Sequence, residues 1–147
     1  MDGTVACPEI LLRGLRQRHV EWDADTETFS ASEAAFLLRR TEDYLSVDRR
    51  APDRVHESFE HWPAEFLVAA ASLHTGKVRA LGLDVEPVPE AGNPAHAGIL
   101  GLPSIYGPVD EAAEAYRLAS DLREQCRFVA YRTPEVAERA RRRALQD

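Results

Sequence analysis

The chain has 147 residues, of which 44% are hydrophobic and 29% are charged. This length and composition match one globular domain and exclude both an intrinsically disordered chain and a fibrous repeat. The formal net charge of −7 disfavours nucleic acid as the main partner, because an acidic protein repels phosphate backbones.

The sequence shows no targeting or membrane signal. Its first residues lack the basic and apolar regions of a secretory signal peptide, and the longest apolar run, Phe66 to Ala71, is too short to cross a bilayer. Cys7 and Cys126 form no C-x-x-C motif, so the paired cysteines of a zinc or redox site are missing. We therefore expect a cytoplasmic protein with two idle thiols and no membrane partner.

The first 28 residues predict one strand followed by an irregular segment. Ile10–Leu12 is a short apolar run closed by Gly14, which is typical of a buried strand with Arg13 at its end. The stretch from 16 to 28 is polar and rich in acidic residues, so we interpret it as a loop.

Residues 30 to 40 carry a helix signal. Ser30 and Glu33 match a capping box, in which the serine hydroxyl accepts from the Glu33 amide while the Glu33 carboxylate reaches back. The pattern predicts a helix from about Ala31 to Arg40.

A second strand and a second helix are predicted next. Tyr44–Val47 is a short strand candidate, and Pro52 suits the first turn of a helix that Pro63 ends. The apolar stripe of this helix consists of Val55, Phe59 and Trp62.

The segment from 66 to 100 predicts three more strands. Residues 66–73 are apolar except for one serine, as expected of a central strand, and 75–81 form a short helical crossover. Residues 85–88 can form a strand only at a sheet edge, because Pro87 has no N–H to donate. Residues 95–100 alternate in the manner of a strand.

The last third predicts two helices. An apolar stripe with a spacing of three and four residues runs from about Asp110 to Arg127. Thr133 and Pro134 then suit the cap and the first position of a final helix. The exposed side of this final helix is basic and carries Arg139, Arg141, Arg142 and Arg143.

Together these elements predict an α+β fold, with a small mixed β-sheet of short strands packed with helices and a long C-terminal helix. We divide the chain into a single α+β domain, 1–132, and a basic C-terminal helical tail, 133–147.

Common catalytic and metal motifs are missing. The sequence has no G-x-S-x-G elbow, P-loop or G-x-G-x-x-G segment, which argues against the usual hydrolase, nucleoside-triphosphatase and dinucleotide folds. His56 and His61 lie five residues apart, roughly 140° around a helix, so both cannot bind one ion and we expect no metal site.

Two segments carry a resemblance to known proteins. Leu45-Ser46-Val47-Asp48-Arg49 and Asn93-Pro94-Ala95-His96-Ala97, with an arginine on the first strand, resemble a group of small, functionally uncharacterised bacterial proteins. The resemblance spans about Leu11 to Gly101 and implies no activity.

The order of residues also resembles, more remotely, the ADP-ribosyltransferase-like fold, which includes the RES-type NAD-degrading toxins. The resemblance implies that Arg13 and Ser46 hold the dinucleotide beside a catalytic glutamate, either Glu57 or Glu60. An arginine fork grips a pyrophosphate, and a carboxylate stabilises the ribosyl cation as nicotinamide leaves. NAD would then be a substrate. The glycine-rich stretch that follows the first strand in RES-type proteins is missing here.

We expect Arg13, Ser46 and His96 to meet at one rim of the sheet and to bind a phosphate-bearing small molecule. The most concrete function is NAD-dependent ADP-ribosyl transfer or NAD hydrolysis. The alternative is a non-catalytic interaction module with a protein partner, such as the small subunit of a larger bacterial complex. A third possibility is an anion-binding regulator that uses its C-terminal arginines.

Overall fold

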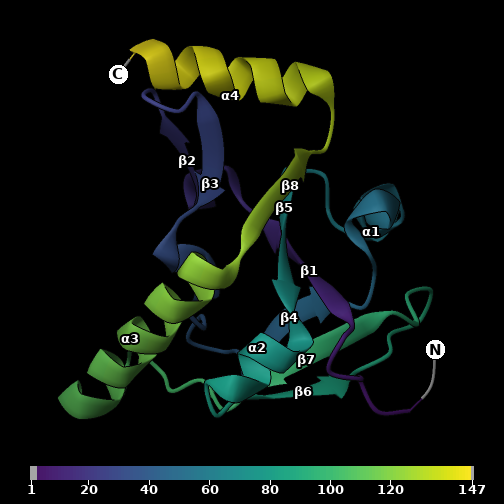
Figure 1. The fold of residues 1–147 in the computed structure, drawn as a ribbon, viewed down its shortest axis with the longest axis vertical. Coiled ribbons are helices and arrows are strands. Elements are labelled where there is room, and N and C mark those ends of the chain that lie inside the picture. Colours follow the sequence, from purple (N-terminus) through teal and green to yellow (C-terminus); the bar gives the residue numbers. More distant parts are fainter. Residues whose placement is uncertain (1–2, 147) are drawn as a thin grey trace.

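The computed structural model describes residues 3–146 and has an α+β fold, which confirms the predicted class (Figure 1). Six strands form one sheet in the order β6-β7-β4-β1-β5-β8. Their bounds are β1 (Ile10–Leu15), β4 (Leu45–Asp48), β5 (Ala69–His74), β6 (Asp84–Pro87), β7 (His96–Leu100) and β8 (Arg127–Tyr131). All described pairings are antiparallel, so the sheet is not the mixed one that the sequence suggested.

Strand β1 lies near the middle of the sheet and is longer than predicted. It pairs with β5 from Ile10 to Leu15, and Leu12 pairs with Asp48 of β4. The strand continues through Gly14, where a Cβ atom would lie 2.9 Å from a methyl group of Leu67. Glycine therefore lets the 62–68 segment pack directly on β1.

The predicted loop at 16–28 is wrong. A 3-10 turn, η1 (Gln17–His19), leads into a hairpin of β2 (Val20–Asp23) and β3 (Thr28–Ala31). Trp22 and Phe29, which are cross-strand partners in this hairpin, pack with ring centroids 4.7 Å apart. This aromatic pair gives the polar segment enough apolar contact to order it.

The predicted helix at 31–40 is also wrong, and only the 3-10 turn η2 (Glu33–Phe36) forms there. In an α-helix the Arg39 amide would donate to the Ala35 carbonyl. Instead, Arg13 Nε donates to the Ala35 carbonyl at 3.0 Å, and the Arg39 amide donates to Glu42 Oε1 at 2.7 Å. Two side chains thus replace the hydrogen bond that would have continued the helix.

The other helices lie close to their predicted positions. They are α1 (Val55–His61), after the turn η3 (Pro52–Arg54), α2 (Thr75–Ala80), α3 (Val109–Gln125) and α4 (Pro134–Gln146). The Val136 amide donates to Thr133 Oγ1 at 3.1 Å, which confirms the predicted cap of α4. The prediction for α3 ran too far, because the chain enters β8 at Arg127.

The helices surround the sheet on several sides (Figure 1). Helix α3 buries a stripe of Ala115, Leu118, Ala119 and Leu122. Helix α4 lies across the end of the β2–β3 hairpin and contacts β8. Strand β6 is an edge strand, as Pro87 predicted. Within residues 3–146, no helix is long and apolar enough to cross a membrane.

Candidate functional site

The two segments singled out in the sequence are neighbours in the sheet. Strands β4 and β7 pair so that Asp48 lies opposite His96. The Arg49 amide donates to the Ala95 carbonyl at 2.8 Å, which extends the ladder beyond the strand ends. The two segments therefore form one structural unit.

A buried network of hydrogen-bonded polar and charged side chains stabilises this unit. The Asp48 carboxylate is fully buried and accepts from Arg50, from Ser58 Oγ at 2.7 Å and from Asn93 Nδ2 at 3.2 Å. Arg50 also donates to Asn93 Oδ1 at 3.0 Å. Because each charge has an opposite charge and further hydrogen bonds, the network offsets the cost of burying them. Asp48 and Arg50 are thus structural.

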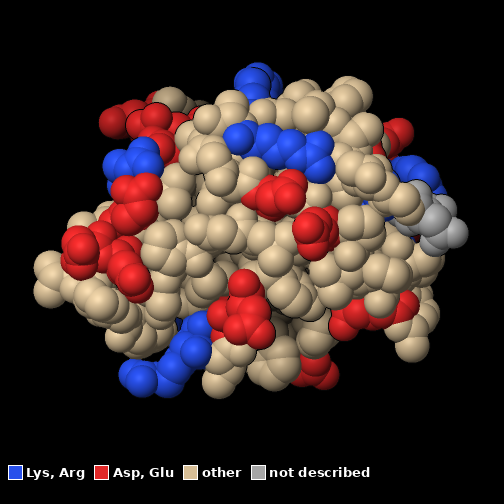
Figure 2. Space-filling model, turned by 90° about the horizontal axis from the view of Figure 1, so that it is seen from below, with Lys and Arg blue, Asp and Glu red and all other residues tan. Residues whose placement is uncertain are grey.

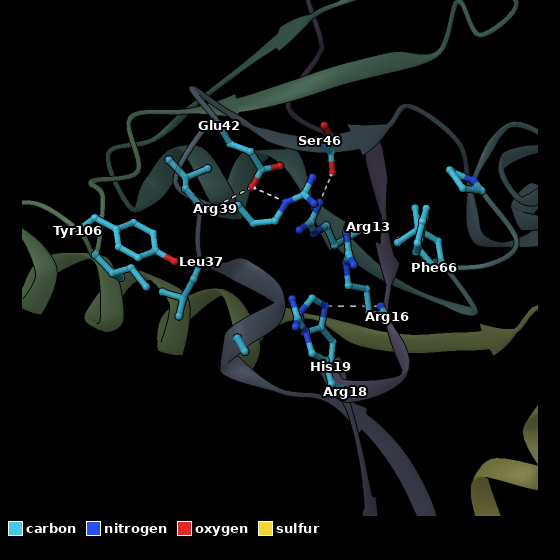
Figure 3. Close-up of a pocket in the computed structure, with 16 residues that line it drawn as sticks. Arg13, Arg16, Arg18, His19, Leu37, Arg39, Glu42, Ser46, Phe66 and Tyr106 are labelled. Atoms are coloured by element: carbon cyan, nitrogen blue, oxygen red, sulfur yellow. Dashed lines mark hydrogen bonds and ion pairs between the residues drawn. The ribbon is translucent and has the colours of Figure 1, made fainter.

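Next to this unit lies a cavity of about 470 Å³ with a cationic lining (Figure 3). Four of its lining residues are arginines, and Glu42 is the one acidic residue among the described lining residues. The arginines come from β1, from the segment after it and from the segment after η2, and they are Arg13, Arg16, Arg18 and Arg39.

Arg13 is at the centre of this cavity. Its Nε donates to the Ala35 carbonyl at 3.0 Å. Its Nη1 donates to the Ser46 carbonyl at 2.9 Å (Figure 3). Among the described residues it forms no ion pair within 4.0 Å. Burial lowers the pKa of Arg13 to about 10, while Glu42 raises it and Arg39 and Arg16 lower it. The guanidinium is still charged at neutral pH.

His19 adds no positive charge to this cavity at neutral pH. Burial and, to a smaller extent, the neighbouring arginines, led by Arg13, together lower its pKa to about 4. Its Nδ1 accepts from the Arg16 amide at 3.4 Å, which suits a neutral ring.

Two aromatic rings form part of the cavity wall. Phe66 is 53% exposed and Tyr106 is 51% exposed. The Arg16 guanidinium lies 5.4 Å from the Phe66 ring centroid, and that of Arg40 lies 4.4 Å from the Tyr106 centroid. The two rings lie on opposite sides of Arg13 in Figure 3. A ligand here would meet both cations and apolar surface.

A second cavity, of about 400 Å³, lies on the other side of Arg13. Arg13, Ser46 and His96 all line it, so the structure brings together the three residues that the sequence suggested for ligand binding. The two cavities share Arg13, Gly14, Ser46, Pro63 and Leu67. The two cavities are therefore adjacent and meet at the Arg13 guanidinium group.

The structure does not bring Glu57 or Glu60 to either cavity. Both lie on α1, where Glu60 is exposed and Glu57 is half-buried, and neither is among the lining residues. Glu57 forms a two-point ion pair with Arg54, whose guanidinium lowers the pKa of that carboxyl. Of the two histidines on α1, His61 lines the second cavity.

Several lining residues were missed in the sequence, namely Arg16, Arg18, His19, Arg39, Glu42 and Glu90. The available signal was the density of arginines: Arg13, Arg16 and Arg18 follow one another at short spacing. Their convergence depends on η1 and η2, two turns that the sequence pattern did not predict. Searches of family models, of curated proteins and of solved structures found no match to this chain.

Proposed function

We propose that this domain binds a small phosphate-bearing molecule in the cavity around Arg13. The observation that carries the proposal is the partly buried Arg13 guanidinium, whose described hydrogen-bond partners are both main-chain carbonyls. A charge that has lost water and has no described carboxylate within 4.0 Å is costly, and a bound anion would lower that cost. Phosphate oxygens suit the planar fork of N–H donors.

The surroundings of Arg13 support the same ligand class. Three further arginines line the cavity, although the chain as a whole carries a formal net charge of −7. Such a local concentration of positive charge attracts anions into the cavity. The leucine and aromatic lining adds apolar surface, so the ligand is expected to carry an apolar or ring-bearing part beside its phosphate.

A second candidate function is cleavage of NAD. It is favoured by the placement of Arg13 and Ser46 in the same two cavities, since the resemblance to the ADP-ribosyltransferase-like fold pairs an arginine with a serine. A glutamate would have to complete that site. Glu57 and Glu60 lie outside the cavities, whereas Glu42 and Glu90 line them.

The test is calorimetric titration with pyrophosphate, ADP and NAD at low salt. Arg13→Gln and Arg39→Gln are expected to weaken binding at least tenfold, because each removes a cation from the cavity. The matched control is Arg117→Gln, which removes an exposed arginine that pairs with Glu114 on α3. Arg39 is 61% exposed in its side chain, so its replacement tests binding even if the Arg13 variant fails to fold.

The outcomes separate the candidates. No binding by the parent protein at millimolar ligand, or equal affinity in all three variants, would overturn the phosphate-binding proposal. Mass spectrometry of the NAD samples tests the second candidate function, cleavage of NAD. Release of nicotinamide supports that function, and intact NAD after prolonged incubation counts against it.

A further inference from the structure

The second cavity differs in chemistry from the first. Arg13 is its one arginine among the described lining residues, and the remaining polar lining consists of Ser46, Asp48, His61, Glu90, Asn93 and His96. Because the cavity opens on the same guanidinium, a ligand whose phosphate pairs with Arg13 can extend a second part of itself into this space. The lining determines what that second part can be.

Part of this polar lining is already satisfied within the protein. Asp48 accepts from three side chains, and Asn93 both donates to Asp48 and accepts from Arg50. These groups have little capacity left for a ligand. The groups that remain are His61, His96, Glu90 and the Ser46 hydroxyl.

One ring nitrogen of His96 already forms a hydrogen bond within the protein. The residue is only 7% exposed, and its Nδ1 lies 2.7 Å from the Val88 carbonyl oxygen. A carbonyl oxygen only accepts, so Nδ1 carries the hydrogen and donates it. In the neutral ring, Nε2 is then an acceptor.

The other nitrogen faces a second acceptor. His96 Nε2 lies 3.3 Å from Glu90 Oε1. In the protonated ring Nε2 would donate to Glu90, whereas in the neutral ring these two atoms cannot hydrogen-bond to each other, because both hold lone pairs. With His96 neutral, hydroxyl groups can donate to both atoms, and the Ser46 hydroxyl, which lines the same cavity, can donate or accept. In that state the cavity offers two acceptors and one hydroxyl to a group rich in hydroxyls.

We propose that the second cavity binds the hydroxyl groups of a sugar or other polyol whose phosphate pairs with Arg13. The substrate class of the site is then a sugar phosphate, with His96 and Glu90 accepting from hydroxyls. This inference rests on the proposed binding of phosphate at Arg13, and it specifies the chemical group that is attached to that phosphate.

The test compares inorganic phosphate, pyrophosphate and ribose 5-phosphate by calorimetric titration at constant pH and salt. We expect ribose 5-phosphate to bind the parent protein at least tenfold more tightly than inorganic phosphate. Glu90→Ala should remove most of that advantage, because it removes the acceptor, while leaving the affinity for inorganic phosphate within twofold. The Glu90 side chain is 59% exposed, so the substitution should not disturb folding. Glu124→Ala, at an exposed glutamate on α3, is the matched control.

The outcomes distinguish this inference from the function on which it rests. If phosphate and pyrophosphate bind through Arg13 but the sugar adds no affinity, the polyol inference is overturned and the phosphate site stands. The same holds if Glu90→Ala keeps the full advantage of ribose 5-phosphate. If none of the three compounds binds, the phosphate site itself is refuted, and the inference falls with it.

Discussion

His19 shows how single residues of the cavity couple stability to pH. Its pKa in the folded protein is about 4, below the ordinary value of 6.5, because burial and nearby arginines disfavour the charged ring. On acidification the unfolded chain therefore takes up this proton before the folded chain does. The stabilisation is fully present above pH 6.5 and is lost as the pH falls towards 4.

We predict that the free energy of unfolding falls between pH 7.5 and pH 5.0, and that His19→Asn makes this fall smaller. Asparagine retains an acceptor for the Arg16 amide but cannot take up a proton. Urea unfolding at the two pH values measures the effect, with the exposed His56→Asn as control. Identical pH dependence in the parent and the His19 variant would show that another group is responsible.

At the residue level, part of the site could be predicted from the sequence. Arg13, Ser46 and His96 lie on strands that apolar runs identify, so their meeting at one place follows from the sheet. Arg39 and Glu42 could not be placed, because their segment reads as a helix. Its conformation depends on Arg13 reaching the Ala35 carbonyl, a contact between residues 22 positions apart.

At the level of elements, the 62–68 segment separates the two cavities, and Arg132 holds it. The Arg132 guanidinium donates to the carbonyls of Phe59, Trp62 and Leu67. It also lies 4.9 Å from the Phe59 ring centroid. Pro63 and Leu67 in turn line both cavities. Arg132 therefore shapes the site without lining either cavity.

We predict that Arg132→Met lowers the free energy of unfolding by about 2 to 3 kcal/mol, because several charge-assisted hydrogen bonds are lost at once. Pyrophosphate affinity should also fall as the segment loosens, although Arg132 lines neither cavity. Urea unfolding and calorimetric titration measure the two effects, with Arg127→Met as an exposed control on the same strand. Unchanged affinity at reduced stability would show that packing on Gly14 is enough to position the segment.

The missed hairpin shows a limit of periodicity at this level. Val20 and Trp22 alternate with Glu21 and Asp23, but four residues are too few to stand out in a polar stretch. Contacts distant in sequence then order the hairpin: Phe29 packs edge-on against Tyr131 of β8 with ring centroids 4.9 Å apart. The hydrophobic periodicity of a segment carries no information about packing against residues distant in sequence.

At the level of the whole molecule, the positive charge is distributed unevenly. On the face seen in Figure 2, basic side chains occur in separate small groups among acidic ones. The first cavity instead gathers four arginines around one glutamate. A cationic cavity in a chain with a formal net charge of −7 favours small anions over long polyanions, which the net negative charge of the molecule repels.

We predict that deletion of residues 133–147 leaves a folded, soluble protein. Helix α4 buries Ala140 and partly buries Val136 and Ala137, so its loss should cost about 2 to 3 kcal/mol. Neither of the cavities that meet at Arg13 contains a residue of α4, and pyrophosphate affinity should be unchanged. Urea unfolding and calorimetric titration of the truncated protein measure both. An insoluble product would show that α4 covers a larger apolar surface than these contacts indicate.

The order of strands in the sheet affects when the fold can form during synthesis. Of the neighbouring strands in the six-stranded sheet, only β6 and β7 are consecutive along the chain. Strand β1 leaves the ribosome before its partners β4 and β5, which follow after long intervening segments, and the outer strand β8 follows all the other strands of the sheet. The nascent chain therefore carries an apolar strand without partners until β4 and β5 emerge, and a chaperone that binds short apolar segments would find its target there.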